Sequence, residues 1–474
     1  MNLNRKSKLP LYRQIANQII TNIQTGELQP GDKLPTERQL AKHYQVNRST
    51  VVHALDELVS SGWILRKQGS GTRVTPGRFG SRQFLFSQWR SLLSGPYLKE
   101  DPFLSELNQR KESTTTIDLY TGALPNQLIP NFIFPSFSWQ QIREEKEKLT
   151  STGYAPLKQE IRHILQQQLH LPDENQDLLI TSGSTQGIIL LMNLLLSSGD
   201  SLATEEPSFL FSLPLFASLQ VRLVGIKQDE EGIIVSALEE AIQQKKIRLL
   251  YLTPNHQNPT GKTMSLKRRN EILAICQKYH LLIIEDDVFQ DLSFDQSIPS
   301  LKSLSPHQVV YIGSLSKVFS ASIKIGWLYA PKPLIKSLAK AKDQMDGESD
   351  IFPQLFAYHA LKSSDYQQKQ KELERSLFQR SQSFEKLLAE FKNDWQFSAI
   401  SGGLYYWLTW KHQKLSRRQW SIFLEKELFV APSFLFSDDT MSVRINYTRL
   451  APEQYDDFQT RFAQVTEFLK NSAI

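Results

Sequence analysis

Lys317 has the clearest chemical potential of any residue in this 474-residue chain. It follows the apolar run VVYIG within the segment SLSK, and a lysine at the end of an apolar strand is unusual because water normally retains the charged amine. A lysine held in an apolar, desolvated pocket releases its proton more easily and can condense with an aldehyde as a Schiff base. Lys317 is therefore our first candidate for covalent chemistry.

Two acidic residues, Asp286 and Asp287, follow another apolar run, LLIIE. Carboxylates at a strand end can ligate a metal, cap a helix or face the nitrogen of a heterocyclic ring. The pair alone does not choose among these three roles.

Two loops carry further polar groups. SGSTQG follows LLIT and opens a helix, so its free amides and the hydroxyls of Ser184 and Thr185 make an anion site suited to a phosphate. Taken alone, that loop is better explained as a plain glycine-containing helix cap. PNHQNPTG follows IRLLYLT and places Asn258 before a proline and a glycine that fix a tight turn.

Apolar runs alternate with helical stretches from Asp118 onward. The runs are LLIT, VRLVGI, IRLLYLT, LLIIE, VVYIG and GWLYA. Such alternation predicts an α/β domain with a mostly parallel sheet and helices on both faces, in which ligands bind at the carboxyl ends of the strands. The polar residues that follow these runs are therefore the candidates for a site.

Taken together, GSLSK, EDD and PNHQNPTG resemble the fold-type I aminotransferases, and the resemblance covers residues 116–474. It implies a pyridoxal-phosphate-dependent transferase fold with a smaller C-terminal α+β subdomain at about 375–474. It also implies pyridoxal 5'-phosphate as the cofactor, Lys317 as the lysine that binds it, and no metal. Asp286 would face the ring nitrogen as the second catalytic residue and keep it protonated, with Asp287 as the alternative.

The resemblance assigns roles to other residues by their positions in this sequence. Asn258 would donate to the ring hydroxyl oxygen, and Phe209 would stack on the ring. The residues expected at the phosphate are Ser184, Thr185, Ser314, Lys324 and Tyr154, the last often supplied by the partner subunit. Arg444, in VRINY, would bind the carboxylate of a substrate or effector through its bidentate fork. Its alternative role is to pair with an acid on the surface of the fold.

The sequence departs from the family at two positions. A tyrosine that donates to the ring oxygen usually follows the acidic pair, whereas here the candidates beside the cofactor are Val288 and Phe289. The family's phosphate arginine is Lys324 here, which keeps the charge and loses the planar fork. We therefore expect a cofactor that is tuned differently and bound more weakly, with its contacts to Lys317 and Asp286 kept.

The first 75 residues are basic. They contain 11 Lys and Arg against 5 Asp and Glu, and so hold the whole formal net charge of +6. Apolar spacing predicts helices over residues 11–25 and 36–44, the second opened by a capping box of Thr36 and Gln39. Asn47 caps a third helix that ends before Gly62, and WILRK, QGSG and TRV predict a two-stranded wing.

In a helix-turn-helix the second helix enters the major groove of DNA with its N-terminus first. LPTERQLAKHYQVNRSTVVHALDELVSSGWILRKQGSGTRV resembles the GntR-type winged helix-turn-helix, and its fusion to the second domain resembles the MocR subfamily of GntR regulators. The residues that would contact double-stranded DNA are Arg38, Asn47, Arg48, Ser49, Thr50, Lys67, Gln68 and Gly69. A solvated helix hairpin that binds protein is the alternative reading of the helical pattern. The resemblance also implies a head-to-tail homodimer with exchanged N-terminal units.

Three segments follow: a DNA-binding domain over 1–75, a linker with a short helix over 76–115, and the aminotransferase-like domain over 116–474. No segment approaches the roughly 20 apolar residues of a membrane helix, and the start has no signal peptide, so we expect a cytoplasmic protein. The single cysteine, Cys276, lies in a helical pattern where we expect a small buried hydrophobe.

We therefore expect a DNA-binding transcription regulator that binds pyridoxal phosphate and senses an amino acid, an amine or the cofactor itself. The competing hypothesis is a catalytically active aminotransferase, with full turnover or one half-reaction, that carries a DNA-binding domain. A third is a decayed domain that binds no cofactor. The two departures at the site favour the sensor over the enzyme.

Overall fold

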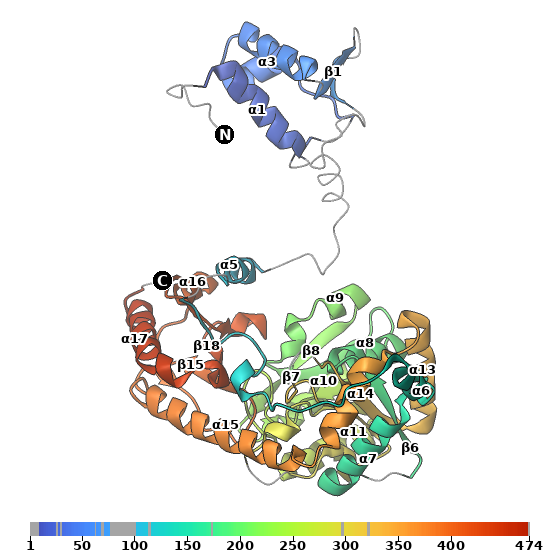
Figure 1. Ribbon diagram of the computed structural model, residues 1–474. Helices are drawn as coiled ribbons and strands as arrows, with labels where there is room; N and C mark the ends of the chain where they lie inside the picture. Colours follow the sequence, from blue (N-terminus) through green and yellow to red (C-terminus); the bar gives the residue numbers. More distant parts are fainter. Residues whose placement is uncertain are drawn as a thin grey trace. The chain divides into compact units, whose positions relative to one another are not determined.

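The computed structural model describes residues 9–24, 27–28, 31–61, 63–67, 71–75, 101–111, 115–171, 174–294, 298–319 and 323–472. The chain divides into two compact units, Met1–Lys99 and Glu100–Ile474, whose elements are labelled in Figure 1. The predicted linker helix, at 84–95, lies outside the described residues.

The N-terminal unit is a winged helix-turn-helix. Its elements are α1 (Leu11–Gln24), α2 (Glu37–Tyr44), α3 (Arg48–Ser60), β1 (Ile64–Lys67) and β2 (Gly71–Val74). The predicted capping box of Thr36 and Gln39 opens α2, and Gln45 ends it in the left-handed conformation, with φ 53°. Asn47 occupies the N-cap position of α3, where we predicted a cap. Its side chain, however, makes no capping hydrogen bond to the helix.

An eight-stranded sheet organises the C-terminal unit. In spatial order its strands are β6 (Gln176–Thr181), β13 (Gly326–Pro331), β12 (Val309–Ser314), β11 (Leu282–Asp286), β10 (Ile247–Leu252), β7 (Ser201–Glu206), β8 (Arg222–Asp229) and β9 (Gly232–Ile233). The sheet is mostly parallel, but β13 runs antiparallel to both of its neighbours and β9 antiparallel to β8. All six predicted runs form strands. The sequence pattern missed β7, because SLATEE ends in two acids instead of continuing as an apolar run.

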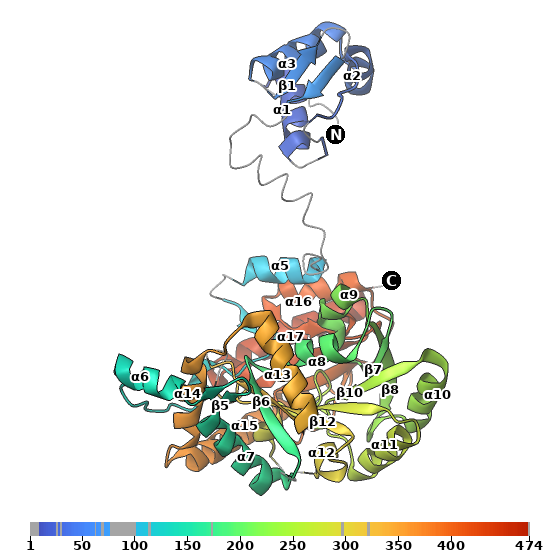
Figure 2. The same cartoon turned by 90° about the vertical axis from the view of Figure 1, so that its right-hand side faces the viewer.

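Helices cover both faces of this sheet, as predicted (Figure 2). The helices α8 (Ser184–Leu195) and α13 (Lys332–Asp346) pack against one face, and α10 (Val235–Lys245) packs against the other beside α11 (Leu266–Lys278). Each face has its own apolar core. Cys276 is fully buried in the second core, where burial raises the pKa of its thiol to about 12, in agreement with the predicted role.

Shorter elements complete the larger part of the unit. They are α6 (Trp139–Lys146), β4 (Leu149–Thr150), β5 (Gly153–Tyr154), α7 (Ala155–Leu169), α9 (Leu215–Leu219), α12 (Leu301–Leu304) and α14 (Ile351–Leu361). No helix in the described ranges has both the length and the apolar character that crossing a membrane requires.

The smaller subdomain is α+β, as predicted. Its elements are α15 (Tyr366–Ala389), α16 (Ser421–Glu425), α17 (Tyr455–Asn471) and the antiparallel sheet β14 (Trp395–Gln396), β15 (Tyr405–Trp410), β18 (Ser442–Asn446) and β17 (Ala431–Pro432), with β16 (Leu428–Phe429) paired to β3 (Ile117–Asp118). The helix α5 (Pro102–Arg110) buries Phe103 and Leu107 in the same core. Residues 101–111, which we assigned to the linker, therefore belong to the C-terminal unit.

Candidate functional site

Lys317 lies in the loop after β12 and is half-buried. Its Nζ donates to the carbonyl oxygen of Gly122 at 2.9 Å and lies 5.2 Å from the centre of the Phe289 ring. Gly122 comes from the segment after β3, and Phe289 follows β11. The lysine amine is thus held where three segments far apart in sequence converge.

Asp286, the last residue of β11, presents one free carboxylate oxygen. The hydroxyl of Tyr251 donates to its Oδ2, whereas the buried Oδ1 has no hydrogen-bond partner in the part of the chain that the structure describes. Burial raises the pKa of this carboxyl to about 6, while the hydrogen bonds from Tyr251 and the Val288 amide and the nearby charge of Lys317 oppose the rise. Asp286 is therefore a buried acceptor set close to the lysine.

Asp287, the alternative to Asp286, has its hydrogen bonds satisfied by the fold. The amide of Asn255 donates to its Oδ1 at 2.8 Å, and the hydroxyl of Tyr311 donates to its Oδ2 at 3.0 Å. Each oxygen of Asp287 thus already accepts a hydrogen bond from a buried side chain, whereas Oδ1 of Asp286 accepts none. The geometry favours Asp286 as the residue that faces a ring nitrogen.

Arg444 and Asn258 contact each other across the two subdomains. Nη1 of Arg444 donates to Oδ1 of Asn258 at 2.8 Å, and Nη2 donates to the carbonyl oxygen of Tyr120 at 2.8 Å. The guanidinium also stacks 4.3 Å from the Tyr405 ring and 4.9 Å from the Phe436 ring. Among the described residues Arg444 forms no ion pair, because both of its Nη atoms donate to neutral oxygens, so the structure does not show the alternative of a surface ion pair.

This contact also fixes the orientation of the Asn258 amide. Because its oxygen accepts from Arg444, its nitrogen points elsewhere, and this nitrogen donates to no acceptor among the residues that the structure describes. Phe209 joins the same cluster, since its backbone amide donates to the carbonyl oxygen of Asn258 at 3.1 Å and its ring lies 6.1 Å from that of Tyr251.

The expected phosphate loop lies at the start of α8. Gly183 precedes Ser184 with φ 81°, and a side chain on Gly326 would come within 2.6 Å of the Ser184 amide, so the loop packs tightly on β13. Thr185 is in the first turn of the same helix. The free amides of this turn are suited to an anion.

Three other residues expected at the phosphate are Ser314, Tyr154 and Lys324. The Ser314 hydroxyl donates to the carbonyl oxygen of Ile325 at 2.9 Å, so its only proton is already engaged, contrary to our expectation of a phosphate donor. Tyr154 is buried and its hydroxyl donates to Glu145 of α6. Lys324 is exposed.

Sequence reasoning missed Tyr251 and Tyr405. Both lie inside strands, where an alternating pattern predicts burial and nothing more. Tyr251 reaches Asp286 because β10 lies beside β11, and Tyr405 reaches Arg444 because β15 pairs with β18. The sequence signal that was available is the hydroxyl itself, because a buried tyrosine normally needs a polar partner.

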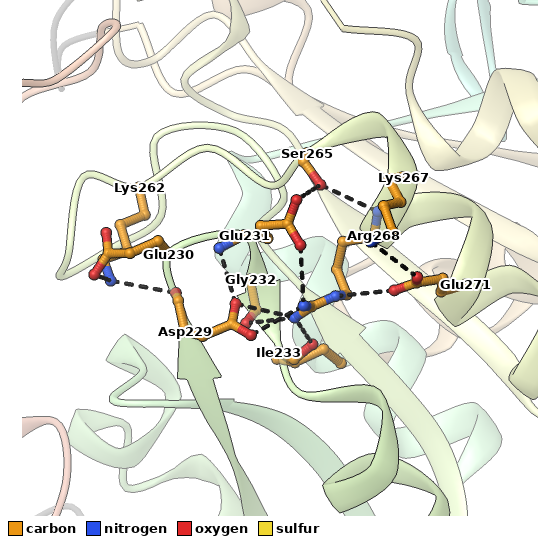
Figure 3. A network of polar contacts seen from close by, with 10 residues as sticks. All are labelled: Asp229, Glu230, Glu231, Gly232, Ile233, Lys262, Ser265, Lys267, Arg268 and Glu271. Carbon is orange, nitrogen blue, oxygen red and sulfur yellow. Dashed lines mark hydrogen bonds and ion pairs between the residues drawn. The ribbon is translucent and has the colours of Figure 1, made fainter.

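The loop that carries Asn258 is anchored from outside by the ion network in Figure 3. Arg268, at the start of α11, pairs with Asp229 at 2.9 Å and with Glu271 at 3.2 Å, and it donates to the two carbonyl oxygens of β9. Lys262, four residues after Asn258, pairs with Glu230 at 2.9 Å. Both contacts tie the chain after Asn258 to the β8–β9 hairpin.

The N-terminal unit presents its own polar cluster. Arg48 is the first residue of α3, and it pairs with Glu37 at 2.8 Å while its side chain stays 69% exposed. Glu37 also pairs with Arg66 of β1 at 2.9 Å, a residue that we did not predict. Other candidates at this surface are the exposed Arg38, Asn47 and Ser49 and the half-buried Thr50. The side chain of Lys67, and Gln68 and Gly69, lie outside the described residues.

The residues around Lys317 fit pyridoxal phosphate. The unpartnered Oδ1 of Asp286 suits a ring N–H, and the free amide nitrogen of Asn258 suits a ring oxygen. The amides at the start of α8 suit a phosphate. The buried Oδ1 of Asp286 is costly to leave without a partner, which favours a ligand at this position.

Comparison with known proteins identifies both units. Residues 11–74 match the family described as bacterial regulatory proteins, gntR family, and residues 116–462 match aminotransferase class I and II. The HTH-type transcriptional regulator YisV of Bacillus subtilis is 32% identical over 464 residues, with 94% of this chain and 93% of YisV covered. The HTH-type transcriptional regulator NorG of Staphylococcus aureus is 26% identical, with 88% and 95% covered.

Solved structures resemble the C-terminal unit. The multiple substrate aminotransferase of Thermococcus profundus superposes with a TM-score of 0.72 at 22% identity, covering 81% of this chain and 100% of that enzyme. The kynurenine aminotransferase of Pyrococcus horikoshii gives 0.72 at 23% identity, with 82% and 100% covered. The similarity at this identity concerns the fold. Both units together show that this chain belongs to the GntR-family transcriptional regulators that carry an aminotransferase class I and II domain, the MocR subfamily.

Proposed function

We propose that this protein is a DNA-binding transcription regulator whose C-terminal unit binds pyridoxal phosphate through Lys317 and senses an amino acid. The observation that carries the proposal is the buried, unpartnered carboxylate oxygen near that lysine, together with an amide nitrogen that is available to a ligand. Among the described residues, Oδ1 of Asp286 accepts no hydrogen bond and the amide nitrogen of Asn258 donates none. They complement the ring nitrogen and the ring hydroxyl oxygen of this cofactor.

When bound, pyridoxal phosphate supplies an aldehyde that reacts with amines and a ring that withdraws electrons. The chain's own residues hold it in place. Asp286 keeps a proton at the ring nitrogen, Asn258 donates to the ring oxygen, and the amides at the start of α8 bind the phosphate with Ser184 and Thr185. Lys324 contributes long-range positive charge, since it lacks the fork of an arginine.

Arg444 supports an effector that carries a carboxylate. Arg444 as a residue is 7% exposed, and its guanidinium is stacked on aromatic rings and meets no acid in the part of the chain that the structure describes. A ligand carboxylate that replaces the neutral oxygens of Asn258 and Tyr120 gains a charge-assisted, bidentate pair. An amino acid therefore fits this site better than a simple amine.

A homodimer is part of the proposal. Large apolar side chains are exposed on neighbouring segments of the C-terminal unit: Ile133 is 95% exposed, Trp139 67%, Met345 56% and Phe352 40%. The pair Lys146–Glu348 joins α6 to the segment before α14, and the Phe134 ring meets that of Phe356 in α14, so the segments that carry these side chains are neighbours. A patch of this kind on a globular protein usually marks an interface.

Tyr154 connects this surface with the cofactor. Its hydroxyl donates to Glu145 of α6, and its backbone amide donates to Gln354 of α14. This position beside the exposed apolar residues supports a role at the phosphate of the partner subunit rather than at its own. Measurement of the solution mass of wild type and of a Trp139→Glu variant tests this, and an unchanged mass in the variant would count against the surface.

The cofactor proposal is tested by adding pyridoxal phosphate to the full-length protein and recording its visible absorbance after dialysis. We expect retained absorbance in wild type and in Lys324→Ala, the second with weaker affinity, and none in Lys317→Ala. The DNA proposal is tested with duplexes from the protein's own promoter region at physiological salt. Binding no tighter than to random DNA would overturn it.

A working aminotransferase is the second candidate function. The observation in its favour is that Lys317, Asp286, Asn258 and Arg444 are connected through the rings of Phe289 and Tyr405. An assay with an amino donor and a 2-oxo acid acceptor separates the two. Repeated turnover favours the enzyme, whereas a single half-reaction or none leaves the regulator.

A further inference from the structure

Tyr405 brings a hydroxyl to the Lys317 site from the smaller subdomain. Its ring meets that of Phe289 edge to face, with centres 5.8 Å apart. A methyl group added to Gly122 would lie 2.7 Å from the Tyr405 hydroxyl oxygen, and the carbonyl oxygen of Gly122 accepts from Lys317 at 2.9 Å. One glycine therefore has the lysine amine and the phenol as immediate neighbours.

The Tyr405 ring is held in this position. The side chain is 1% exposed, and the guanidinium of Arg444 stacks on its face at 4.3 Å. A side chain on Gly261 would come within 2.5 Å of the backbone oxygen of Tyr405. The strand β15 therefore packs tightly against the loop that carries Asn258. In the described ranges no hydrogen bond involves this hydroxyl, and its oxygen is not among the completely buried side-chain atoms that lack a partner. The hydroxyl can therefore donate to a bound ligand.

We propose that the Tyr405 hydroxyl contacts the cofactor bound at Lys317 and replaces the phenol that the side chain of Phe289 lacks. This inference rests on the proposed function, because it presumes that pyridoxal phosphate binds there. The position of Phe289 keeps an aromatic ring, which supports Tyr405 from the side. The hydroxyl that contacts the cofactor then comes from the smaller subdomain and not from the larger one.

A phenol at this place has a defined electrostatic effect. When it donates to the ring oxygen of the cofactor, it stabilises negative charge there and weakens that oxygen's hold on the proton of the Lys317 nitrogen. That proton then leaves at lower pH. Loss of the hydroxyl raises the pH midpoint of the change in visible absorbance by about one unit, the size expected for a hydrogen bond to a charged group.

The experiment is a pH titration of the visible absorbance of the cofactor-loaded full-length protein. The variants are Tyr405→Phe, Phe289→Tyr and the double variant, with Tyr406→Phe as the matched control. Tyr406 is the next residue on β15, and its hydroxyl donates to Glu385 inside the smaller subdomain at 2.7 Å. We expect a raised midpoint in Tyr405→Phe, restoration in the double variant, and wild-type midpoints in Phe289→Tyr and Tyr406→Phe.

The opposite pattern overturns the inference. If Tyr405→Phe titrates like wild type while Phe289→Tyr lowers the midpoint, the site has no phenol of its own and Tyr405 serves packing alone. If Tyr405→Phe binds too little cofactor to titrate, the Phe289→Tyr variant decides. A lowered midpoint in that variant overturns the inference, and a wild-type midpoint supports it. Absence of cofactor absorbance in wild type would instead refute the proposed function.

Discussion

The hydroxyl of Tyr251 donates to Oδ2 of Asp286, and the other oxygen of that carboxylate has no partner in the described part of the chain. Tyr251 is itself completely buried, on the strand next to that of Asp286. Its bond lowers the pKa of Asp286 against the effect of burial, which raises this pKa to about 6. The tyrosine thus helps to keep the carboxyl ionised.

Tyr251→Phe should weaken binding of pyridoxal phosphate and make it more sensitive to acid. Without the hydroxyl the pKa of Asp286 rises further, and a protonated acid no longer pairs with a protonated ring nitrogen. We expect an affinity about 10-fold lower at neutral pH, as for one hydrogen bond to a charged group. Fluorescence titration with the cofactor at several pH values measures this. Tyr311→Phe, which removes the bond to Asp287, is the control and should change the affinity much less.

Because His256 is buried, we predict that the folded protein loses stability in acid. The side chain is 2% exposed, and burial, aided by the charge of Arg269, lowers its pKa from 6.5 to about 4. The folded protein holds His256 in its neutral form. The contribution of His256 to the free energy of unfolding is therefore complete above about pH 6.5 and disappears as the pH falls toward 4. Its full size is about 3 kcal/mol in the free energy of unfolding.

The variant His256→Asn isolates this effect. Asparagine tolerates the left-handed conformation that His256 adopts, with φ 49°. Glu205 and Glu285 act in the opposite direction, because burial raises the pKa of each to about 7 and their contribution disappears as pH rises. Denaturant titration at each pH gives the unfolding free energies of wild type and variant. The contributions of Glu205 and Glu285 are present in both proteins and cancel in the difference. An unchanged difference between pH 7 and 4 would refute the prediction.

The sequence predicted the larger part of the site because its residues follow strands. The carboxyl ends of parallel strands share one edge of a sheet, so Asp286, Asn258 and Lys317 meet there. Tyr251 and Tyr405 are mid-strand residues, and their contacts depend on which strands are neighbours and which face of β15 meets the larger subdomain. Local pattern carries neither fact.

Ser314 shows a second limit. Its position relative to Lys317 matches the family motif, but its hydroxyl donates to the carbonyl oxygen of Ile325. This residue comes directly before β13, which pairs with β12 in antiparallel fashion. The sequence pattern predicted both strands and not their antiparallel pairing. A motif can therefore specify where a residue lies without specifying which bond its hydroxyl makes.

Arg444→Gln should separate effector binding from cofactor binding. Glutamine can still donate to Asn258, but it removes the charge that a ligand carboxylate needs, so amino-acid affinity should fall about 100-fold while cofactor affinity changes little. Spectral titration with an amino acid and with the matching amine measures both. Arg444→Lys keeps the charge without the fork and should give an intermediate loss. Equal binding of amino acid and amine by wild type would contradict the role of Arg444.

Arg48→Ala should reduce DNA affinity and its dependence on salt. Arg48 is exposed at the start of the helix expected in the major groove, and Glu37 holds it together with Arg66 on one surface. Loss of one phosphate contact lowers the slope of log affinity against log salt by about 1. Arg13→Ala is the matched control, because Arg13 is also exposed and paired with a glutamate, Glu57, but lies on α1. Fluorescence anisotropy with a promoter duplex at several salt concentrations measures both slopes. An equal change in the two variants would mean that net charge alone, and not the position of Arg48, determines binding.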